Sequence, residues 1–453
     1  MLRRRSKTLR LNKVRVFLET PLFLLYALAY HSGRLSIVDA FLGLVEDRSL
    51  CKMLKSYCRL GDELKDLVRR NIDPGTALLS IAKRVDEPVS SLLASYAQVL
   101  RISGDMIDFL ETWSQTFLHR VDRFIEDRGE LVNTLLEVVV LSSTMLMLSI
   151  LFLNLNSIAT IATMTLAMGG LMLAAGFYLQ TPSLNIYLGL PDKTMTLLSS
   201  VSWALSLAGY AVYLYMGLTP ALALLIPGLV IAVYIMYKIR MELRVLDDIT
   251  SFLEVIADEV RTGVRLDTQV VLERLRANPR LLALSYVLRT GLEPSYAVRE
   301  DPLTGIVKKF LAVLVRSGAE ASRAITTASS LLSRMRTFIT GLNNRGLFYE
   351  VILALAVIVM IASIKTYCSY MTKPLLPGAA SEVGTQYGFM PGLEQIISVP
   401  SEPLLKITFM SIIIVLDAAA AAIAAVTRSS PLLALSPPLI SLAGIAATMV
   451  TLA

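Results

Sequence analysis

Residues 138–191 read VVVLSSTMLMLSILFLNLNSIATIATMTLAMGGLMLAAGFYLQTPSLNIYLGLP and contain no charged side chain. After Asp192 and Lys193 the next charge is Lys238, so a second uncharged stretch follows the first. A helix needs about 20 mostly apolar residues to cross the hydrocarbon core of a bilayer. Each stretch is long enough for two crossings, and residues 138–237 are therefore predicted to hold four transmembrane helices.

The C-terminal part of the chain is predicted to add three more transmembrane helices. Two long apolar runs occur there, followed by a third that Pro437-Pro438 interrupts. The sequence thus predicts about seven spans, near residues 138–155, 158–179, 195–216, 221–237, 347–370, 405–427 and 432–452.

Charged residues are concentrated in two blocks outside these spans. Residues 1–137 and 238–350 together hold 38 of the 43 basic and 31 of the 36 acidic residues. Charged residues make up 17% of the whole chain, against roughly 25% in soluble domains. This distribution excludes a disordered chain and a single soluble core, and it predicts two polar domains in an integral membrane protein.

Basic side chains next to the spans predict which side of the membrane each domain occupies. Loops on the cytoplasmic side carry an excess of Lys and Arg. Both polar blocks are basic beside their spans, and the four spans between them allow both to be cytoplasmic. The loop 371–404 and the C-terminus are then outside the cell membrane. The basic residues are Arg120, Arg123 and Arg128 before the first span, and Lys238, Arg240 and Arg244 after the fourth.

The first fifteen residues carry seven basic side chains, which equals the net charge of +7 of the chain. We interpret this segment as attracted to anionic lipid, and a contact with an acidic ATPase surface is the alternative. No aromatic interleaving accompanies the charge, so we expect no nucleic-acid partner. The apolar run at residues 16–30 gives the outline of a signal peptide. Glu19 and Pro21 interrupt that run, and we interpret it instead as the opening helix of the first polar domain.

The polar blocks read as helical bundles that repeat one another. Apolar residues recur at helical spacing, for example Ile249, Phe252, Leu253, Ile256 and Val260. Prolines 74, 88, 279, 294 and 302 stand near predicted helix starts, where a missing N–H costs little. Three segments match in the same order, each copy leading into a span: 23–33 with 252–263, 70–74 with 290–294, and 101–104 with 315–318.

A helical module of this kind, present twice with each copy leading into a span, resembles the type II secretion system F-protein domain. Four spans between the copies resemble the archaeal pilus and archaellum members. The resemblance implies a platform that assembles type IV pilus-like filaments over a cytoplasmic hexameric ATPase, receives pilin-like subunits from the lipid bilayer, and forms a homodimer. Residues 71–73 lack the glycine that the family pattern places there. Matching residues, taken as structural or partner-contact candidates, are Gly33, Gly104, Asp105, Gly263 and Gly318.

The predicted fold is therefore an all-α, polytopic helical membrane protein with two homologous cytoplasmic helical-bundle domains. Both domains are expected to continue directly into a span, with Gly346 at the second junction. The predicted organisation is a basic segment 1–15, a first helical domain 16–137, four spans in 138–237, a second helical domain 238–346, and three spans in 347–453 with the external loop 371–404.

The sequence offers few candidates for catalysis or for cofactor binding. No phosphate-binding loop with a G-x-x-x-x-G-K-[ST] pattern and no H-E-x-x-H motif occurs. An aspartyl protease needs two apposed carboxylates, and the apolar regions offer only Asp192, in a loop, and Asp417. Two histidines do not supply a His-rich metal site, and Cys51 and Cys58 are predicted to be small buried thiols. We expect a non-enzymatic protein without a cofactor or a metal.

Asp417 is the remaining candidate site residue, because it stands near the middle of the sixth predicted span. A charged group in hydrocarbon is costly, so the side chain should face protein. It either contacts a pilin-like span or is a protonated carboxyl bonded to a neighbouring hydroxyl. Small residues at 418–422 and at Gly170-x-x-x-Ala174 predict close helix packing, within the subunit or across a dimer, and a pilin-binding groove is the alternative. A transporter or channel is the alternative function, although few polar residues occur in the first four spans.

Overall fold

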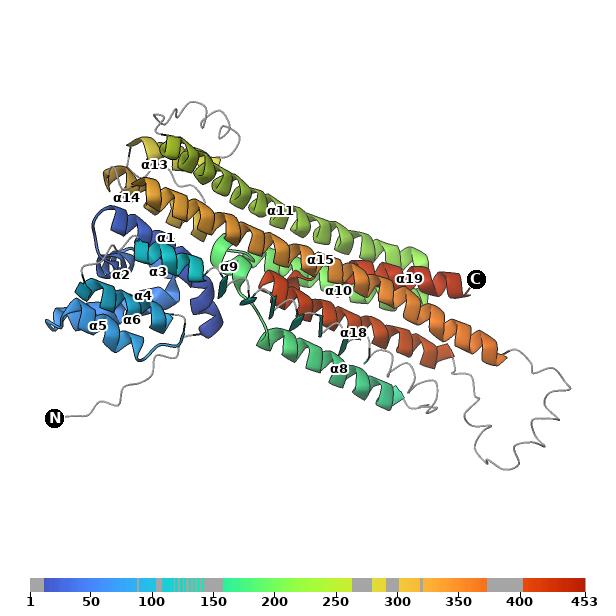
Figure 1. Ribbon diagram of the computed structural model, residues 1–453. Coiled ribbons are helices and arrows are strands. Elements are labelled where there is room, and N and C mark those ends of the chain that lie inside the picture. The colour runs from blue at the N-terminus through green and yellow to red at the C-terminus, as the bar shows by residue number, and fades with distance from the viewer. Residues whose placement is uncertain are drawn as a thin grey trace. The chain divides into compact units, whose positions relative to one another are not determined.

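The computed structural model of the 453-residue chain describes residues 12–87, 89–102, 108–117, 158–262, 279–290, 301–317, 321–372 and 402–452, with scattered positions between 119 and 141 (Figure 1). Every regular element in these residues is a helix, so the predicted all-α class is confirmed for this part of the chain. Contacts divide the chain into two compact units. Unit 1 comprises Met1–Glu126, Thr181–Leu190 and Ile239–Gly341, and unit 2 comprises Asp127–Gln180, Pro191–Lys238 and Leu342–Ala453.

The helix α1 (Lys13–Ser32) is the core of unit 1. It follows the N-cap Asn12, and almost every residue from Val16 to Ala29 is buried. It packs against α2 (Ile37–Glu46), α4 (Lys55–Arg69), α6 (Val89–Ile102) and α14 (Pro302–Ser317). The apolar run that follows the basic segment is thus the central helix of a helical bundle.

Prolines begin three helices of unit 1, as their positions in the sequence predict. They are Pro74 in α5 (Pro74–Ala82), Pro279 in α13 (Pro279–Thr290) and Pro302 in α14. Proline favours the first helical position because its φ angle is already helical and no N–H partner is lost. At α5 the side chain of Asp73 caps the helix by accepting from the Thr76 N–H at 3.0 Å.

The structure corrects the prediction for Cys51 and Cys58, which form a disulfide. Two residues seven apart in one continuous helix lie about 10 Å apart along its axis, too far for a disulfide. The chain instead leaves the helical conformation at Leu54, between α3 (Arg48–Met53) and α4. This turn brings the two Cα atoms to 5.2 Å.

Two further segments belong to unit 1. The short helix α9 (Ser183–Leu188) lies between two membrane-type helices in the sequence and contacts α1 and α14. The Tyr187 hydroxyl donates to the Leu18 carbonyl at 2.7 Å.

The other segment comes from the second polar block. There Arg280 of α13 contacts Glu242 at 2.5 Å and Asp301 at 3.3 Å. Asp301 also caps α14 through the Thr304 N–H at 3.1 Å.

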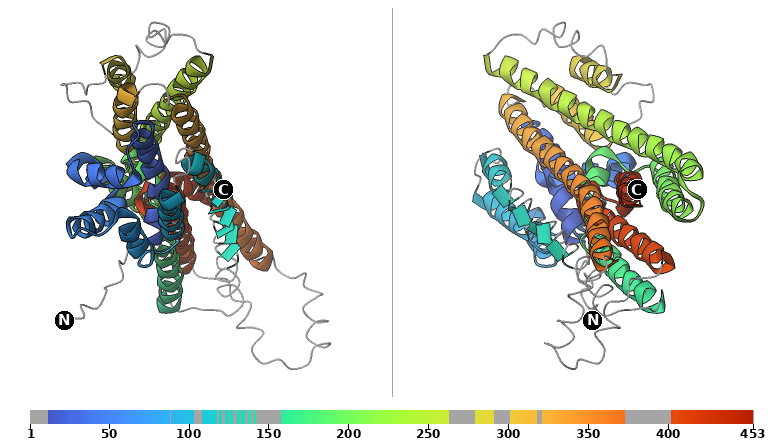
Figure 2. Two further views of the ribbon diagram at one scale, coloured as in Figure 1. Left: turned by 60° about the vertical axis from the view of Figure 1, so that its left-hand side comes forward. Right: turned by 90° about the vertical axis from the view of Figure 1, so that its right-hand side faces the viewer.

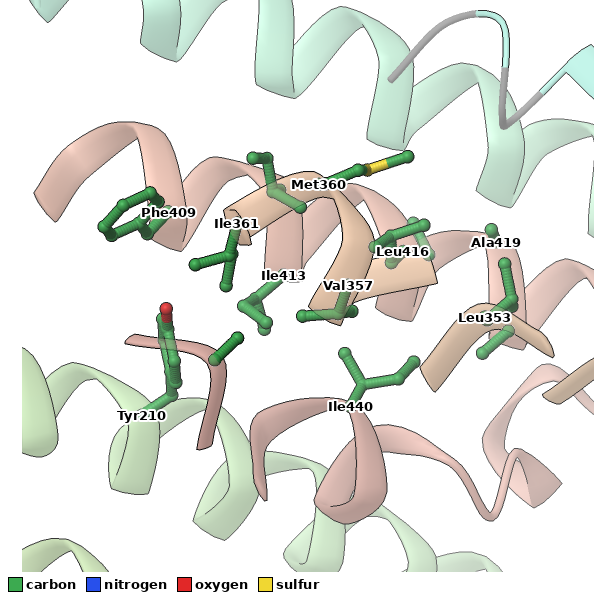
Figure 3. Packing of buried hydrophobic residues seen from close by; sticks show 14 of the residues in the cluster. Tyr210, Leu353, Val357, Met360, Ile361, Phe409, Ile413, Leu416, Ala419 and Ile440 are labelled. Carbon is green, nitrogen blue, oxygen red and sulfur yellow. The ribbon is translucent and has the colours of Figure 1, made fainter. Parts of the chain in front are cut away.

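Unit 2 is built from long apolar helices around α18 (Glu402–Arg428). In α18 89% of the apolar window is buried, against 28–33% in the other four candidate spans. It packs most extensively on α8 (Ile158–Tyr178), and the two lie side by side (Figure 1, Figure 2). It also contacts α10 (Lys193–Met216), α19 (Pro437–Leu452) and the turn η1 (Pro431–Leu433). Figure 3 shows buried side chains of α18 packed among those of α10, α15 and α19.

Among the described residues, five helices are long and apolar enough to cross a membrane, as expected for a multi-pass membrane protein. They are α8, α10, α11 (Leu218–Thr262), α15 (Ala321–Thr372) and α18. Most of the first predicted span and of the loop 371–404 lies outside the described residues. The last apolar helix, α19, has only 16 residues. Seven spans therefore stay a prediction.

One of the two predicted small-residue faces packs within unit 2. Residues 418–426 of α18 are buried, as close packing requires. On α8, however, the glycine that meets this face is Gly176, where an added Cβ would lie 2.6 Å from the Ala422 Cα. Gly170 has nothing within 4 Å of such a Cβ, and both Gly170 and Ala174 are exposed. The predicted Gly170-x-x-x-Ala174 face thus points away from the packing between α8 and α18.

Candidate functional site

Two of the six site residues proposed from the sequence lie in the described part of the chain, Gly33 and Asp417. The other four, Gly104, Asp105, Gly263 and Gly318, lie outside it. The two described residues belong to different units, so each is considered by itself.

Gly33 ends α1, but its backbone does not require a glycine. Its φ angle is −85°, whereas the next residue, Arg34, has a φ of 61°. The Leu35 N–H donates to the Tyr30 carbonyl at 3.0 Å and the Arg34 N–H to the His31 carbonyl at 2.9 Å. This pattern closes the helix with a left-handed residue after the cap. The left-handed position therefore falls on Arg34, one residue later than the glycine that marks the repeat.

Asp417 lies inside the packing of unit 2. It is 1% exposed, and neither carboxylate oxygen has a hydrogen-bond partner among the described residues. Ile413, one turn earlier on the same face of α18, lies within 3 Å of the position that a Cβ on Gly444 of α19 would occupy. Tyr210 of α10 also approaches that position, at 2.8 Å. Asp417 thus belongs to the face of α18 that turns toward α10 and α19.

The buried face of α10 is unexpectedly polar, and sequence reasoning missed it. Ser199, Ser202, Ser206 and Tyr210 are all buried there. Ser202 donates to the Gly228 carbonyl at 2.8 Å, and Ser206 donates to the Ser202 carbonyl at 2.7 Å. The sequence did contain a signal for this face, because these polar residues recur every three or four positions within an apolar run. Because their hydroxyl protons go to backbone carbonyls, Ser202 joins α10 to α11 and Ser206 braces α10 itself.

The Asp192 carboxylate at the other end of α10 has a structural role. It caps α10 by accepting from the Met195 N–H at 2.7 Å, and it pairs with Lys238 of α11 at 2.7 Å. This pair ties the start of α10 to α11. Asp192 is therefore engaged as a helix cap and in an ion pair, which does not favour a role as one half of a catalytic carboxylate pair.

Unit 1 contains an open cavity of about 660 Å3 between α1, the turn from α2 to α3, and α14. Tyr26 and Tyr30 line one wall, and their hydroxyls share a hydrogen bond of 2.9 Å. Opposite charges meet in its lining, where Lys309 pairs with Asp47 at 2.9 Å. Burial raises the pKa of Tyr26, so this phenol stays protonated.

The cavity lies where the first polar block meets the second. Asp47 belongs to the first block and Lys309 to the second, and both blocks contribute to unit 1. Glu46 and Arg48 add one further charge of each sign to the lining. No group of three or more His, Cys, Asp or Glu side chains that could hold a metal is found among the described residues. The lining is suited to polar contacts with a partner.

Comparison of the chain with models of known protein families, with curated proteins and with solved structures found no match.

Proposed function

We propose that the chain is the integral membrane platform of a type IV pilus-like filament or a type II secretion-like machine. In this role it couples a cytoplasmic assembly ATPase to the insertion of pilin-like subunits into the filament. The observation that carries the proposal is the course of two helices. Both α11 and α15 pass from unit 1 into unit 2 without a break in the helix.

The distribution of charge supports a soluble partner for unit 1 and a membrane partner for unit 2. Unit 1 draws on the two charged blocks of the sequence, and unit 2 draws on the segments with the longest uncharged runs. A charged helical body is suited to a soluble partner, whereas exposed apolar helices are suited to lipid and to the apolar helices of membrane subunits. Continuous helices between the units give a direct mechanical route from one to the other.

The further parts of the proposal follow from sidedness and from the resemblance to the F-protein domain. Unit 1 is cytoplasmic and the protein resides in the cell membrane, because basic residues flank the spans on the side of unit 1. The platform acts without its own catalysis, cofactor or metal, and it works as a homodimer. Gly104, Asp105, Gly263 and Gly318 remain candidates for structural or partner-contact roles in the two repeats.

Deletion of the gene, combined with purification, tests the proposed function. We expect loss of surface filaments or of secretion on deletion, and recovery of a hexameric ATPase with the tagged protein from detergent extracts. The matched control is a tagged membrane protein of similar size from the same cells. Normal filaments and normal secretion after deletion would refute the proposal.

A transporter or channel is the second candidate, and the unpartnered Asp417 favours it. Buried ionisable groups in membrane helices often mark substrate or proton pathways. Solute flux in proteoliposomes that contain only this protein, abolished by Asp417→Asn, would support the transporter. For the platform, Asp417→Asn separates two roles of this carboxyl. Normal filament numbers are expected if Asp417 is only structural. Reduced filament numbers are expected if Asp417 contacts a pilin-like span.

A further inference from the structure

A buried charge cluster joins three segments of unit 2 at the end of α18. Arg428, the last residue of α18, is fully buried, and its Nη1 donates to the Glu350 Oε1 of α15 at 2.5 Å. Its Nε donates to the Asn343 Oδ1 at 3.2 Å. Its Nη1 also donates to the Leu433 carbonyl at 2.9 Å, and the Leu435 N–H donates to the other Glu350 oxygen at 2.9 Å. We call Asn343, Glu350 and Arg428 the clamp.

The clamp lies next to a close approach of α15 and α18 at Gly346. Asn343, Gly346 and Glu350 follow each other at i, i+3 and i+7, so they share one face of α15. Gly346 packs directly on Thr427, because an added Cβ would lie 2.5 Å from the Thr427 Oγ1. The absent side chain of Gly346 therefore serves the close approach of two helices, and α15 continues through this position without a break.

Farther along, apolar side chains continue the same contact. Leu416 and Ala419 of α18 lie beside Val357 and Leu353 of α15 (Figure 3). The apolar contact alone specifies the register between the helices less strictly, because hydrophobic burial is not directional. The buried ion pair specifies it more strictly, because each charge has lost its water and only its partner and the neighbouring hydrogen bonds compensate for that loss. The clamp thus fixes one register between the helices.

Among the described residues, the ion pair that attaches the other helix passing between the units, α11, is less buried than the clamp. Where α11 enters unit 2, Lys238 pairs with Asp192, and their side chains are 19% and 22% exposed. This pair is more accessible to water than the clamp, so it restrains α11 less than the clamp restrains α15. In the clamp, Arg428 and Glu350 are 0% and 2% exposed. The attachment in unit 2 is therefore stronger at α15 than at α11.

We infer that α15 and α18 move as one body, held together by the clamp, so that a displacement of α15 is carried to the central helix of the membrane unit. The inference rests on the proposed function, since it names the elements that transmit motion within the platform. Arg428 and Glu350 are positioning residues in this device. Because α18 has the most buried surface of the candidate spans, its movement displaces the helices packed around it.

A double-mutant cycle tests the clamp without reference to filaments. Glu350→Leu and Arg428→Met are each expected to lower the unfolding midpoint in detergent, because each strands a buried charge. The double variant is expected to be at least as stable as either single variant. The control Arg345→Met removes an exposed charge from the same helix and should leave the midpoint unchanged. Additive losses in the double variant would overturn the clamp.

An engineered disulfide then tests movement as one body. The Cβ positions of residues 346 and 427 lie 3.0 Å apart, within about an ångström of disulfide spacing. We expect the Gly346→Cys, Thr427→Cys double variant to form a cross-link in isolated membranes. We also expect the cross-linked variant to assemble filaments at the same level as the same variant kept reduced. Loss of assembly on cross-linking, or failure to cross-link, would overturn the inference. If deletion of the gene leaves filaments intact, the proposed function is refuted. The double-mutant cycle and the cross-linking yield still test whether the clamp joins α15 to α18.

Discussion

Buried polar side chains orient α1 in a way that its apolar residues do not. The helix is apolar on nearly every side, so burial alone leaves its rotation open. Thr20 shares a hydrogen bond of 2.8 Å with the Tyr57 hydroxyl, and His31 shares one of 2.8 Å with Tyr96. Each bond satisfies a group that is costly to bury alone, so the two together select one rotation.

Glu19 is the most informative of these residues because it titrates. It is fully buried, 2.6 Å from the Arg15 guanidinium, and it accepts from the Ser56 N–H at 2.8 Å. Burial outweighs these contacts and raises the pKa of Glu19 above its ordinary value of 4.5. The folded state therefore holds this proton more tightly than the unfolded state, and its contribution to stability falls as pH rises from about 4.5 through the raised pKa.

We predict that Glu19→Gln removes this part of the pH dependence. The difference between the unfolding midpoints of the wild type and the variant should be constant at low pH. As pH rises from about 4.5 through the raised pKa of Glu19, the wild-type midpoint should fall relative to that of the variant. Thermal unfolding in detergent across a pH series measures the difference. Glu46→Gln is the control, since it makes the same chemical change at a side chain that is 70% exposed. A constant difference for Glu19→Gln would contradict the assignment.

At the scale of helices, signals local to the sequence were sufficient for many boundaries. Pro74, Pro279 and Pro302 each begin a helix, because a proline acts on its own turn whatever surrounds it. Contacts between distant segments were not predictable in this way. Glu350 and Arg428 are 78 residues apart, and either one reads as an ordinary charge at the end of an apolar run. The clamp depends on which faces of α15 and α18 meet, which a single sequence does not specify.

The glycines of α8 show the same limit and give a prediction. Gly176→Ala should destabilise the protein by about 1–3 kcal/mol, because the added methyl meets the backbone of Ala422 and forces α8 and α18 apart. Gly170→Ala has open space and should be neutral or stabilising by up to about 1 kcal/mol, as alanine favours the helix. Unfolding midpoints of the two variants measure the contrast. Equal effects would show that α8 does not pack on α18 through Gly176.

The disulfide between α3 and α4 is a second prediction at this scale. Closing so short a loop should contribute about 2.5 kcal/mol, so Cys51→Ala with Cys58→Ala should lower the unfolding midpoint. Thiol titration of the denatured protein checks the bond itself. We expect one reactive thiol before reduction and three after it, because the chain has three cysteines. Three thiols before reduction would show that the bond does not form in the cell, where most cytoplasmic proteins keep their thiols reduced.

For the whole molecule, the two charged blocks are far apart in sequence but contribute to one compact unit. The sequence predicted two helical domains, one on each side of the four spans in 138–237. Composition shows that each block avoids the membrane, but it carries no information on whether the blocks contact each other. That information lies in contacts such as Lys309 with Asp47, which joins residues on opposite sides of the apolar segment.

Sidedness is the property of the whole molecule that the proposed function needs most. Labelling of single cysteines with a membrane-impermeant maleimide measures it, in a Cys368→Ala background where the disulfide protects Cys51 and Cys58. We expect Ser381→Cys and Ala453→Cys to react in intact cells, and Asp62→Cys, on the exposed face of α4, to react only after permeabilisation. Reaction of Asp62→Cys in intact cells would put unit 1 outside and contradict a cytoplasmic ATPase contact.

The same experiment decides the number of spans. At 16 residues, α19 is about 24 Å long, which is shorter than the roughly 30 Å of hydrocarbon in a typical bilayer. Its ends need thinner lipid or the neighbouring turn η1 to complete a crossing. If α19 does cross, Ala453→Cys reacts from outside together with Ser381→Cys, because α18 and α19 form a hairpin that begins and ends on that face. Reaction of Ser381→Cys alone would leave the C-terminus inside, reduce the predicted spans to six, and make α19 a helix packed on α10 that does not cross the membrane.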